Sequence, residues 1–189
     1  LVRLGAPGRQ NVANALASFA MAIRLGCDPA RLLDALADFQ GVNRRFTRRT
    51  AESGFLIIDD YGHHPTEIRA TMAAARLLAD ERAGKLYVVF QPHRYTRTRN
   101  FLKDFGGALR GADSLFLTEI YSAGEPPIDG ITSLTLRDCI ARDAGCAVEL
   151  VPDFIDIQKN IQKCIKNDDI VLLLGAGSVT NLTDLLSSC

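Results

Sequence analysis

The sequence predicts an α/β fold in which a mostly parallel sheet carries helices on both faces, preceded by a short helical segment. From Thr47 onward, short apolar runs of strand length alternate with segments of helical periodicity. Such alternation requires right-handed crossovers between parallel strands, which put helices on both faces of the sheet. Before residue 46 the pattern is helical alone. We therefore expect a Rossmann-like domain over residues 46–189 and a helical remnant of another domain over residues 1–45.

The helical remnant consists of two amphipathic stretches. Residues 11–26 form the first helix, which Gly26 ends, and residues 28–41 form the second, with Asp28 as N-cap and Pro29 in the first turn. Two helices within about 45 residues do not enclose a core of their own. The sequence also opens without Met or a domain start, so we expect a fragment of a longer protein.

The remaining elements follow in regular alternation. Strands are expected near 46–50, 55–59, 86–91, 114–118, 147–151 and 169–174, and helices near 65–80, 98–110, 133–144, 154–166 and 179–187. The first strand could pair antiparallel with the second as a hairpin. All the other pairings are expected to be parallel.

The stretch FLIIDDYGHHP at 55–65 is where polar residues gather first. A buried strand stops in Asp59, Asp60, Tyr61, His63 and His64, and Pro65 then opens a helix. In open α/β sheets, ligands bind at the carboxyl ends of the strands. The sequence therefore predicts a ligand site here; the alternative is an acid-rich loop that caps the helix.

A second strand, LYVVF at 86–90, ends in QPHRYTRTR. His93, Arg94, Arg97 and Arg99 follow it directly, so all three histidines of the chain lie at these two strand ends. If a helix begins near residues 96–98, Arg94, Arg97 and the helix N–H groups could converge on a carboxylate or phosphate. The alternative is a solvated basic turn.

Three further segments leave their roles open. The last strand ends in Gly-Ala-Gly-Ser at 175–178, but Thr180 breaks the dinucleotide fingerprint, so a tight turn is as good an interpretation as a cofactor loop. A redox enzyme using NAD is accordingly disfavoured. Glu125 could reach the same sheet edge or cap a surface loop. Of the adjacent Arg44 and Arg45, at most one can easily enter a cleft, and both could be solvated linker residues.

Composition and missing motifs exclude other classes. The 22 basic and 22 acidic residues balance, so nucleic-acid or membrane-surface binding has no support. No apolar run approaches the roughly 20 residues that span a bilayer. The five cysteines lack CxxC spacing, which indicates reduced thiols in a cytoplasmic protein and no metal site. The chain also lacks the phosphate-loop, GxSxG and HExxH motifs.

Six strings, in order, carry a family resemblance: GRQNVANALA, GVNRRF, DDYGHHPTEI, FQPHRYTRTR, YSAGEPPIDG and LLLGAGS. Over essentially all 189 residues the chain resembles the C-terminal part of a Mur ligase, in the branch that joins L-alanine to UDP-N-acetylmuramate. The resemblance implies three domains. Residues 1–45 would end the central ATPase domain and 46–189 would form the C-terminal domain. The phosphate loop would lie upstream of Leu1, and the fragment alone would be inactive.

The resemblance also implies chemistry and site residues. ATP, with Mg²⁺, would activate the lactyl carboxylate of UDP-N-acetylmuramate as an acyl phosphate, which the L-alanine amine attacks in peptidoglycan precursor synthesis. The implied partners are these two substrates and the missing domains. ATP would be bound by Asn11, Asn14, Arg45, Asp60 and Tyr61. Substrate would be bound by His63, Arg94, Arg97 and the Ala176 backbone, and catalysis would involve Arg45, His63, Arg94 and Arg97. His64 and His93 would shape their loops.

One departure from the family pattern is Gln10, where the family usually has His, and a glutamine cannot carry a charge. Two other functions remain open at this point. One is a murein peptide ligase, which attaches recycled tripeptide. The other is a nucleotide- or sugar-binding module without catalysis.

Overall fold

The computed structural model describes residues 3–4, 9–39 and 41–188. The chain divides between Asn43 and Arg44 into two compact units, each described here by itself. The side chain of Gln10 lies outside the described part, although its backbone belongs to the first helix. No helix among the described residues is long and apolar enough to cross a membrane.

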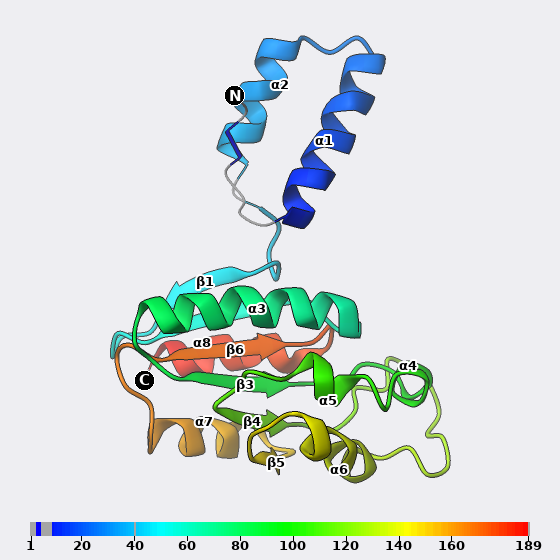
Figure 1. Ribbon diagram of the computed structural model, residues 1–189, viewed down its shortest axis with the longest axis vertical. Coiled ribbons are helices and arrows are strands. Elements are labelled where there is room, and N and C mark those ends of the chain that lie inside the picture. The colour runs from blue at the N-terminus through cyan, green and yellow to red at the C-terminus, as the bar shows by residue number, and fades with distance from the viewer. Residues whose placement is uncertain (1–2, 5–8, 40, 189) are drawn as a thin grey trace. The chain divides into compact units, whose positions relative to one another are not determined.

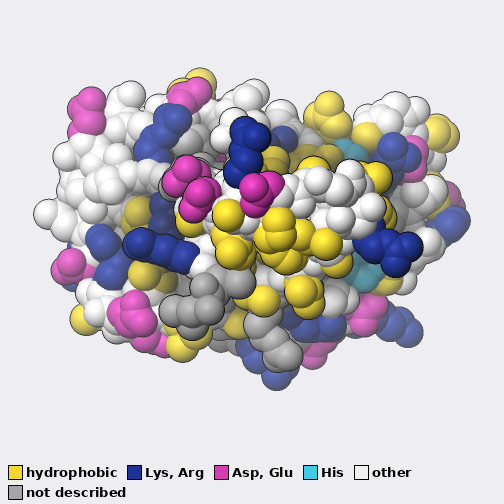
Figure 2. Space-filling model, turned by 90° about the horizontal axis from the view of Figure 1, so that it is seen from above, with side chains coloured by type: hydrophobic (Ala, Val, Ile, Leu, Met, Phe, Trp, Pro, Cys, Tyr) yellow, Lys and Arg dark blue, Asp and Glu magenta, His cyan; other side chains and the backbone are white. Residues whose placement is uncertain are grey.

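The first unit contains helices α1 (Arg9–Arg24) and α2 (Pro29–Asp38). Asp28 caps α2 by accepting a hydrogen bond from the Ala30 N–H at 2.7 Å, and Gly26, with φ of 85°, turns the chain between the helices. No described residue of α2 is buried. The large exposed apolar side chains of this unit are those of Val12, Leu16, Met21, Ile23, Leu25, Leu33, Phe39 and Val42. Figure 2 shows exposed hydrophobic side chains gathered on the face in view.

The second unit is built on a six-stranded sheet with the order β1-β2-β6-β3-β4-β5 (Figure 1). The strands are β1 (Thr47–Thr50), β2 (Leu56–Asp60), β3 (Leu86–Phe90), β4 (Ser114–Leu117), β5 (Val148–Leu150) and β6 (Ile170–Leu174). β1 pairs antiparallel with β2, and every other pairing is parallel. The predicted fold class, all six strands and the antiparallel hairpin are confirmed.

Helices cover both faces of this sheet because successive strand residues point to opposite sides. On one face Ile58, Val88 and Leu172 join a core that includes side chains of α3 (Pro65–Glu81), α5 (Phe105–Ala108) and α6 (Ser133–Asp143). On the other, Ile57 and Val89 pack with side chains of α7 (Phe154–Gln162) and α8 (Leu182–Ser187). β2, β3 and β6 are buried along their whole length, as strands covered on both faces must be.

The helix predicted over 98–110 is wrong. The structure has two short helices there, α4 (Tyr95–Asn100) and α5, separated by turns at 101–104. Gly106 lets α5 approach α6 closely. A Cβ at this position would lie 2.9 Å from the Asp143 Cβ and 3.1 Å from the Ile140 carbonyl oxygen. The predicted last helix is likewise a 3₁₀ turn, η1 (Ser178–Asn181), followed by α8.

The strand order positions the site. β6, the last strand, lies between β2 and β3, and all three run parallel. Their carboxyl ends therefore meet at one edge of the sheet. The segments that follow them, at 61–64, 91–94 and 175–178, are neighbours there.

Candidate functional site

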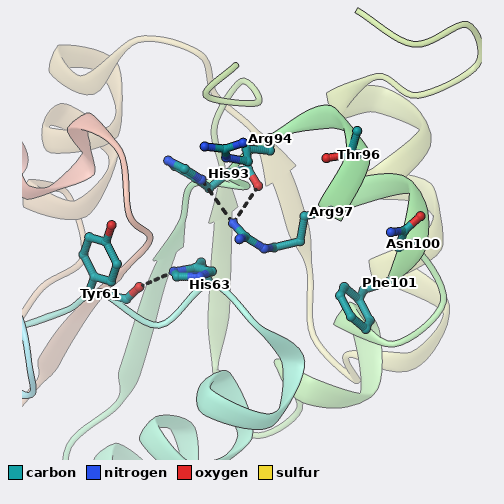
Figure 3. A pocket seen from close by; sticks show the side chains of 8 residues that line it. All are labelled: Tyr61, His63, His93, Arg94, Thr96, Arg97, Asn100 and Phe101. Carbon is teal, nitrogen blue, oxygen red and sulfur yellow. Dashed lines mark hydrogen bonds between the residues drawn. The ribbon is translucent and has the colours of Figure 1, made fainter. Parts of the chain in front are cut away.

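A pocket of about 450 Å³ opens beside the loops that follow β2 and β3. It is lined by Tyr61, His63, His93, Arg94, Thr96, Arg97, Asn100 and Phe101 (Figure 3). The predicted site residues His63, Arg94 and Arg97 are thus brought together, although they come from two strand ends and a helix. Ala176 is not among the lining residues; it lies on the adjacent loop after β6.

His63 lies in this pocket between Tyr61 and Arg97 (Figure 3). Its Nδ1 is 2.9 Å from the Tyr61 carbonyl oxygen. Because a carbonyl can only accept, Nδ1 must carry the proton, and Nε2 is left with a lone pair. Burial lowers the pKa of His63, an effect that the nearby Arg97 charge strengthens. The ring is therefore an unprotonated base at neutral pH.

His93 is the second pocket histidine, and its tautomer is the opposite one. Arg97 Nη1 lies 3.1 Å from His93 Nδ1 and also donates to the His93 carbonyl at 3.2 Å. Since a guanidinium can only donate, Nδ1 accepts and the proton resides on Nε2. Burial and the Arg97 charge lower the pKa of His93 to about 4. Its ring stacks on Tyr121, with centroids 5.4 Å apart.

Arg94 has an unusual backbone, with φ of 72° and ψ of 136°, a region that side-chain-bearing residues rarely occupy. Its guanidinium is about half exposed and lies 3.3 Å from Glu125. Glu125 also accepts from the Thr96 N–H at 3.0 Å and from the Thr96 hydroxyl at 2.8 Å. The open question about Glu125 is answered: it reaches the sheet edge. The Thr96 N–H at the start of α4 donates to the Glu125 carboxylate, and convergence of the helix N–H groups on a bound anion stays a prediction.

The loop before the pocket is held by His64 and Asp60. His64 caps α3, accepting from the Thr66 N–H at 3.3 Å. Asp60 is buried, and its carboxylate accepts from the Phe46 N–H at 2.8 Å, the Gly62 N–H at 2.8 Å and the Thr71 hydroxyl at 3.2 Å. Both oxygens of Asp60 are thus engaged inside the domain, so the structure gives it a supporting role. Its predicted contact with the nucleotide ribose stays a prediction.

The two linker arginines separate in the structure. Arg44 Nη2 donates to the carbonyls of Gly175 at 2.5 Å and Gly177 at 3.1 Å, so this side chain is tied to the loop after β6. The Arg45 side chain is 49% exposed and forms a long ion pair with Glu67, at 3.8 Å. The guanidinium groups of Arg44 and Arg45 both lie over the Tyr61 ring. Arg45 therefore keeps a charge that an outside anion can reach.

Sequence reasoning missed Gln91 and the structural importance of Arg44. Gln91 is buried and joins two strand ends, donating to the Ser178 hydroxyl at 3.1 Å and accepting from the Val179 N–H at 2.9 Å. A polar residue directly after an apolar strand is the signal that could have found it, but its partner lies 88 residues away.

Two of the predicted ATP-binding residues lie outside the second unit. Asn11 and Asn14 lie on α1 in the first unit, and the Asn14 side chain is exposed. Within the described ranges, no group of three or more His, Cys, Asp or Glu side chains could hold a metal ion.

Known proteins with similar sequences belong to one family of ligases. A family model described as "Mur ligase, glutamate ligase domain" matches residues 44–177. A UDP-N-acetylmuramate–L-alanine ligase of Acidithiobacillus ferrooxidans is 45% identical over 181 residues, which are 96% of this chain and 38% of that protein. One from Mycobacterium sp. is 42% identical over 182 residues, 96% of this chain and 37% of that protein. The chain thus spans well under half the length of these relatives.

Solved structures of related ligases have a similar fold. A UDP-N-acetylmuramate–alanine ligase of Thermotoga maritima superimposes with a TM-score of 0.76 at 31% identity, covering 98% of this chain and 38% of that one. A murein peptide ligase of Psychrobacter arcticus gives a TM-score of 0.72 at 23% identity, with the same coverage of 98% and 38%. The second likeness shows the fold alone.

Proposed function

The chain belongs to the Mur ligase family, and from this premise we propose that it is part of an ATP-dependent ligase. The proposed reaction joins L-alanine to the lactyl carboxylate of UDP-N-acetylmuramate via an acyl phosphate, in cytoplasmic peptidoglycan precursor synthesis. The observation that carries the proposal is the pocket in which Arg94 and Arg97 lie beside His63, whose pKa burial lowers.

The two arginines fit the charge problem of this reaction. The activated carboxylate and the phosphate that leaves are anionic, so cationic donors at fixed positions stabilise the charge that develops in the transition state. Arg97 is held by His93, and Arg94 by its backbone contacts and Glu125. Both guanidinium groups line the pocket, where each can offer N–H groups to a carboxylate or phosphate.

His63 fits the second requirement, because the ammonium group of L-alanine must lose a proton before it can attack. The Nε2 lone pair of His63 is left free by the Nδ1 hydrogen bond to the Tyr61 carbonyl. A neutral imidazole in hydrogen-bond reach of the amine can accept that proton. We assign His63 this role together with orientation of the amine.

ATP would supply the phosphoryl group. The predicted ATP-binding residues differ in how well their surroundings suit contact with a nucleotide. Arg45 fits a phosphate contact because it is half exposed and its carboxylate partner is distant. Tyr61, flanked by both linker arginines, stays a candidate neighbour of the nucleotide. Asp60 fits less well, because its oxygens are engaged. Roles for Asn11 and Asn14 near adenine, for the Ala176 backbone, and for residues 1–45 as the end of the central domain remain proposals.

The 42–45% identity to alanine ligases favours L-alanine over the murein peptide ligase alternative, whose solved example shares 23% identity. To test this, the chain replaces the matching segment of the Acidithiobacillus ferrooxidans relative. Phosphate release is then measured with UDP-N-acetylmuramate and either L-alanine or the recycled tripeptide. We expect turnover with L-alanine. Turnover with tripeptide only would support the alternative, and a folded chimera inactive with both would contradict the proposal.

A matched pair of variants in the same chimera tests the site. Arg94→Ala should raise the KM for L-alanine or UDP-N-acetylmuramate by about tenfold or more, since a charge-assisted hydrogen bond contributes about 1.5–3 kcal/mol. Arg99→Ala is the control, because Arg99 is exposed and does not line the pocket. Its KM values should stay within about twofold. The reverse order of effects would refute the assignment.

A further inference from the structure

The loop from Tyr121 to Gly130 contains Glu125, whose carboxylate contacts Arg94 but takes no part in the proposed chemical steps. It turns back on itself between Ser122 and Glu125, whose N–H donates to the Ser122 carbonyl at 3.0 Å. Ala123 and Gly124, the central residues of this turn, have φ of 51° and 83°. An L-residue such as alanine pays about 1–2 kcal/mol in the left-handed region. The turn therefore forms despite the conformational free-energy cost at Ala123. It places Glu125 beside the first turn of α4.

The Glu125 side chain lies at the surface but is only 17% exposed, because its carboxylate is covered by the contacts that it makes. One oxygen accepts from the Thr96 N–H, and the other accepts from the Thr96 hydroxyl and from Arg94 Nη1, at 3.0, 2.8 and 3.3 Å. These contacts keep the carboxylate ionised, since the hydrogen bond from the Thr96 N–H lowers the pKa of Glu125. A single carboxylate therefore joins the first turn of α4 to the Arg94 guanidinium.

The same loop also holds the backbone of Arg94 from the other side. The Arg94 N–H donates to the Tyr121 carbonyl at 2.8 Å, while the Arg94 carbonyl accepts from the Thr98 N–H at 3.0 Å and its hydroxyl at 2.8 Å. Hydrogen bonds to both the N–H and the carbonyl of Arg94 thus stabilise its rare backbone conformation. Among the described residues, Glu125 is the side chain that hydrogen-bonds the guanidinium, and it does so through Nη1.

We propose that Glu125 is a positioning residue for Arg94: it holds the guanidinium at the pocket so that its other N–H groups face an anionic substrate. The class of that anion, a carboxylate or acyl phosphate, rests on the proposed function. The positioning itself rests on the contacts of Glu125. Arg97 provides the internal comparison, because His93 holds it without a carboxylate.

The test uses the 189-residue chain labelled with ¹⁵N, and observes the guanidinium N–H signals of Arg94 and Arg97. In Glu125→Ala, exchange of the Arg94 guanidinium protons with water should rise about fivefold, while Arg97 stays unchanged. Glu125→Gln keeps one acceptor oxygen, so its Arg94 exchange rate should lie between those of the wild type and Glu125→Ala. Asp129→Asn removes a charge from an exposed residue of the same loop and should change neither signal. Equal exchange at Arg94 in all four proteins would overturn the proposal.

The same Arg94 and Arg97 signals are then recorded during titration with acetate and with inorganic phosphate, which gives the affinity for each anion. Affinity for the probe should fall in the order wild type, Glu125→Gln, Glu125→Ala, by about three- to tenfold in total. The opposite order would show that Glu125 is an internal competitor of the anion and would overturn positioning. If neither probe binds the wild-type chain, the anion pocket of the proposed function fails. The exchange data still decide the role of Glu125 in that case.

Discussion

At the scale of single residues, hydrogen-bond partners that can only donate or only accept determine the protonation of the site. The Tyr61 carbonyl places the His63 proton on Nδ1, and the Arg97 guanidinium places the His93 proton on Nε2. Two histidines whose ring centroids are 5.8 Å apart thus take opposite tautomers. One presents a lone pair to the pocket, and the other supports an arginine. The same residue type therefore does two different jobs.

His93 should make the stability of the domain sensitive to acid. Its folded pKa is about 4, below the ordinary value of 6.5, so the unfolded chain binds the proton more readily. The stabilisation is fully present above pH 6.5 and is lost as the pH falls toward 4. We expect a loss of about 1–2 kcal/mol between pH 7.5 and 4.5, allowing for solvent screening. Urea denaturation measures it.

The control for this measurement is His93→Asn, whose side-chain oxygen can still accept from Arg97 but does not titrate. Other groups also respond to acid, so the difference between the two proteins is the quantity of interest. The variant should lose less stability than the wild type over the same pH range. Identical losses would show that His93 does not contribute.

At the scale of elements, the loop after β6 is shaped by the strand end beside it. Gly175 has φ of 147°, and a Cβ there would lie 2.7 Å from the Gln91 carbonyl oxygen. A Cβ at Gly177 would lie 2.5 Å from Gln91 Oε1 and 2.6 Å from the Tyr121 ring. The two glycines are therefore needed for close approach between loops, whether or not the backbone also meets a ligand.

Gly177→Ala should destabilise the domain by about 1–3 kcal/mol, because the added methyl group must displace Gln91 or Tyr121. Gly107→Ala is the matched control, since a Cβ there meets nothing within 4 Å. Gly107 lies in α5, so its replacement by alanine should be neutral or stabilising by up to about 1 kcal/mol. Chemical denaturation measures the free energy of unfolding of both variants. Equal stabilities would contradict the close packing at Gly177.

At the scale of the whole molecule, the sheet order assembles the site. β6 is last in sequence yet lies between β2 and β3, so its loop meets loops more than 80 residues earlier, as in the bond from Val179 to Gln91 with a separation of 88. Arg44, the first residue of the second unit, bonds to Gly175 at a separation of 131. Hydrogen bonds between segments distant in sequence therefore hold the loops together at this edge of the sheet.

The chain by itself should not hydrolyse ATP, because its sequence has no phosphate loop. Phosphate release is measured with ATP, Mg²⁺, UDP-N-acetylmuramate and L-alanine, and the full-length Acidithiobacillus ferrooxidans relative is the positive control. The expected rate is indistinguishable from the rate without protein. Sustained turnover would mean that a phosphate cradle exists within these 189 residues.

The sequence by itself determined the strands, most helices, the fold class and the ends of β2 and β3 as the place where polar residues gather around a pocket. These features follow from periodicity and turn residues within a few positions of one another. Only the tertiary structure decided that Arg44 binds the β6 loop, that Asp60 is engaged internally, that Glu125 holds Arg94, and which nitrogen of each histidine is protonated. The physical reason is that most of these hydrogen bonds join residues distant in sequence, so no local pattern encodes the partner. The chain from 95 to 108 likewise forms two short helices where periodicity predicted one, and Gly106 in the second packs closely on α6.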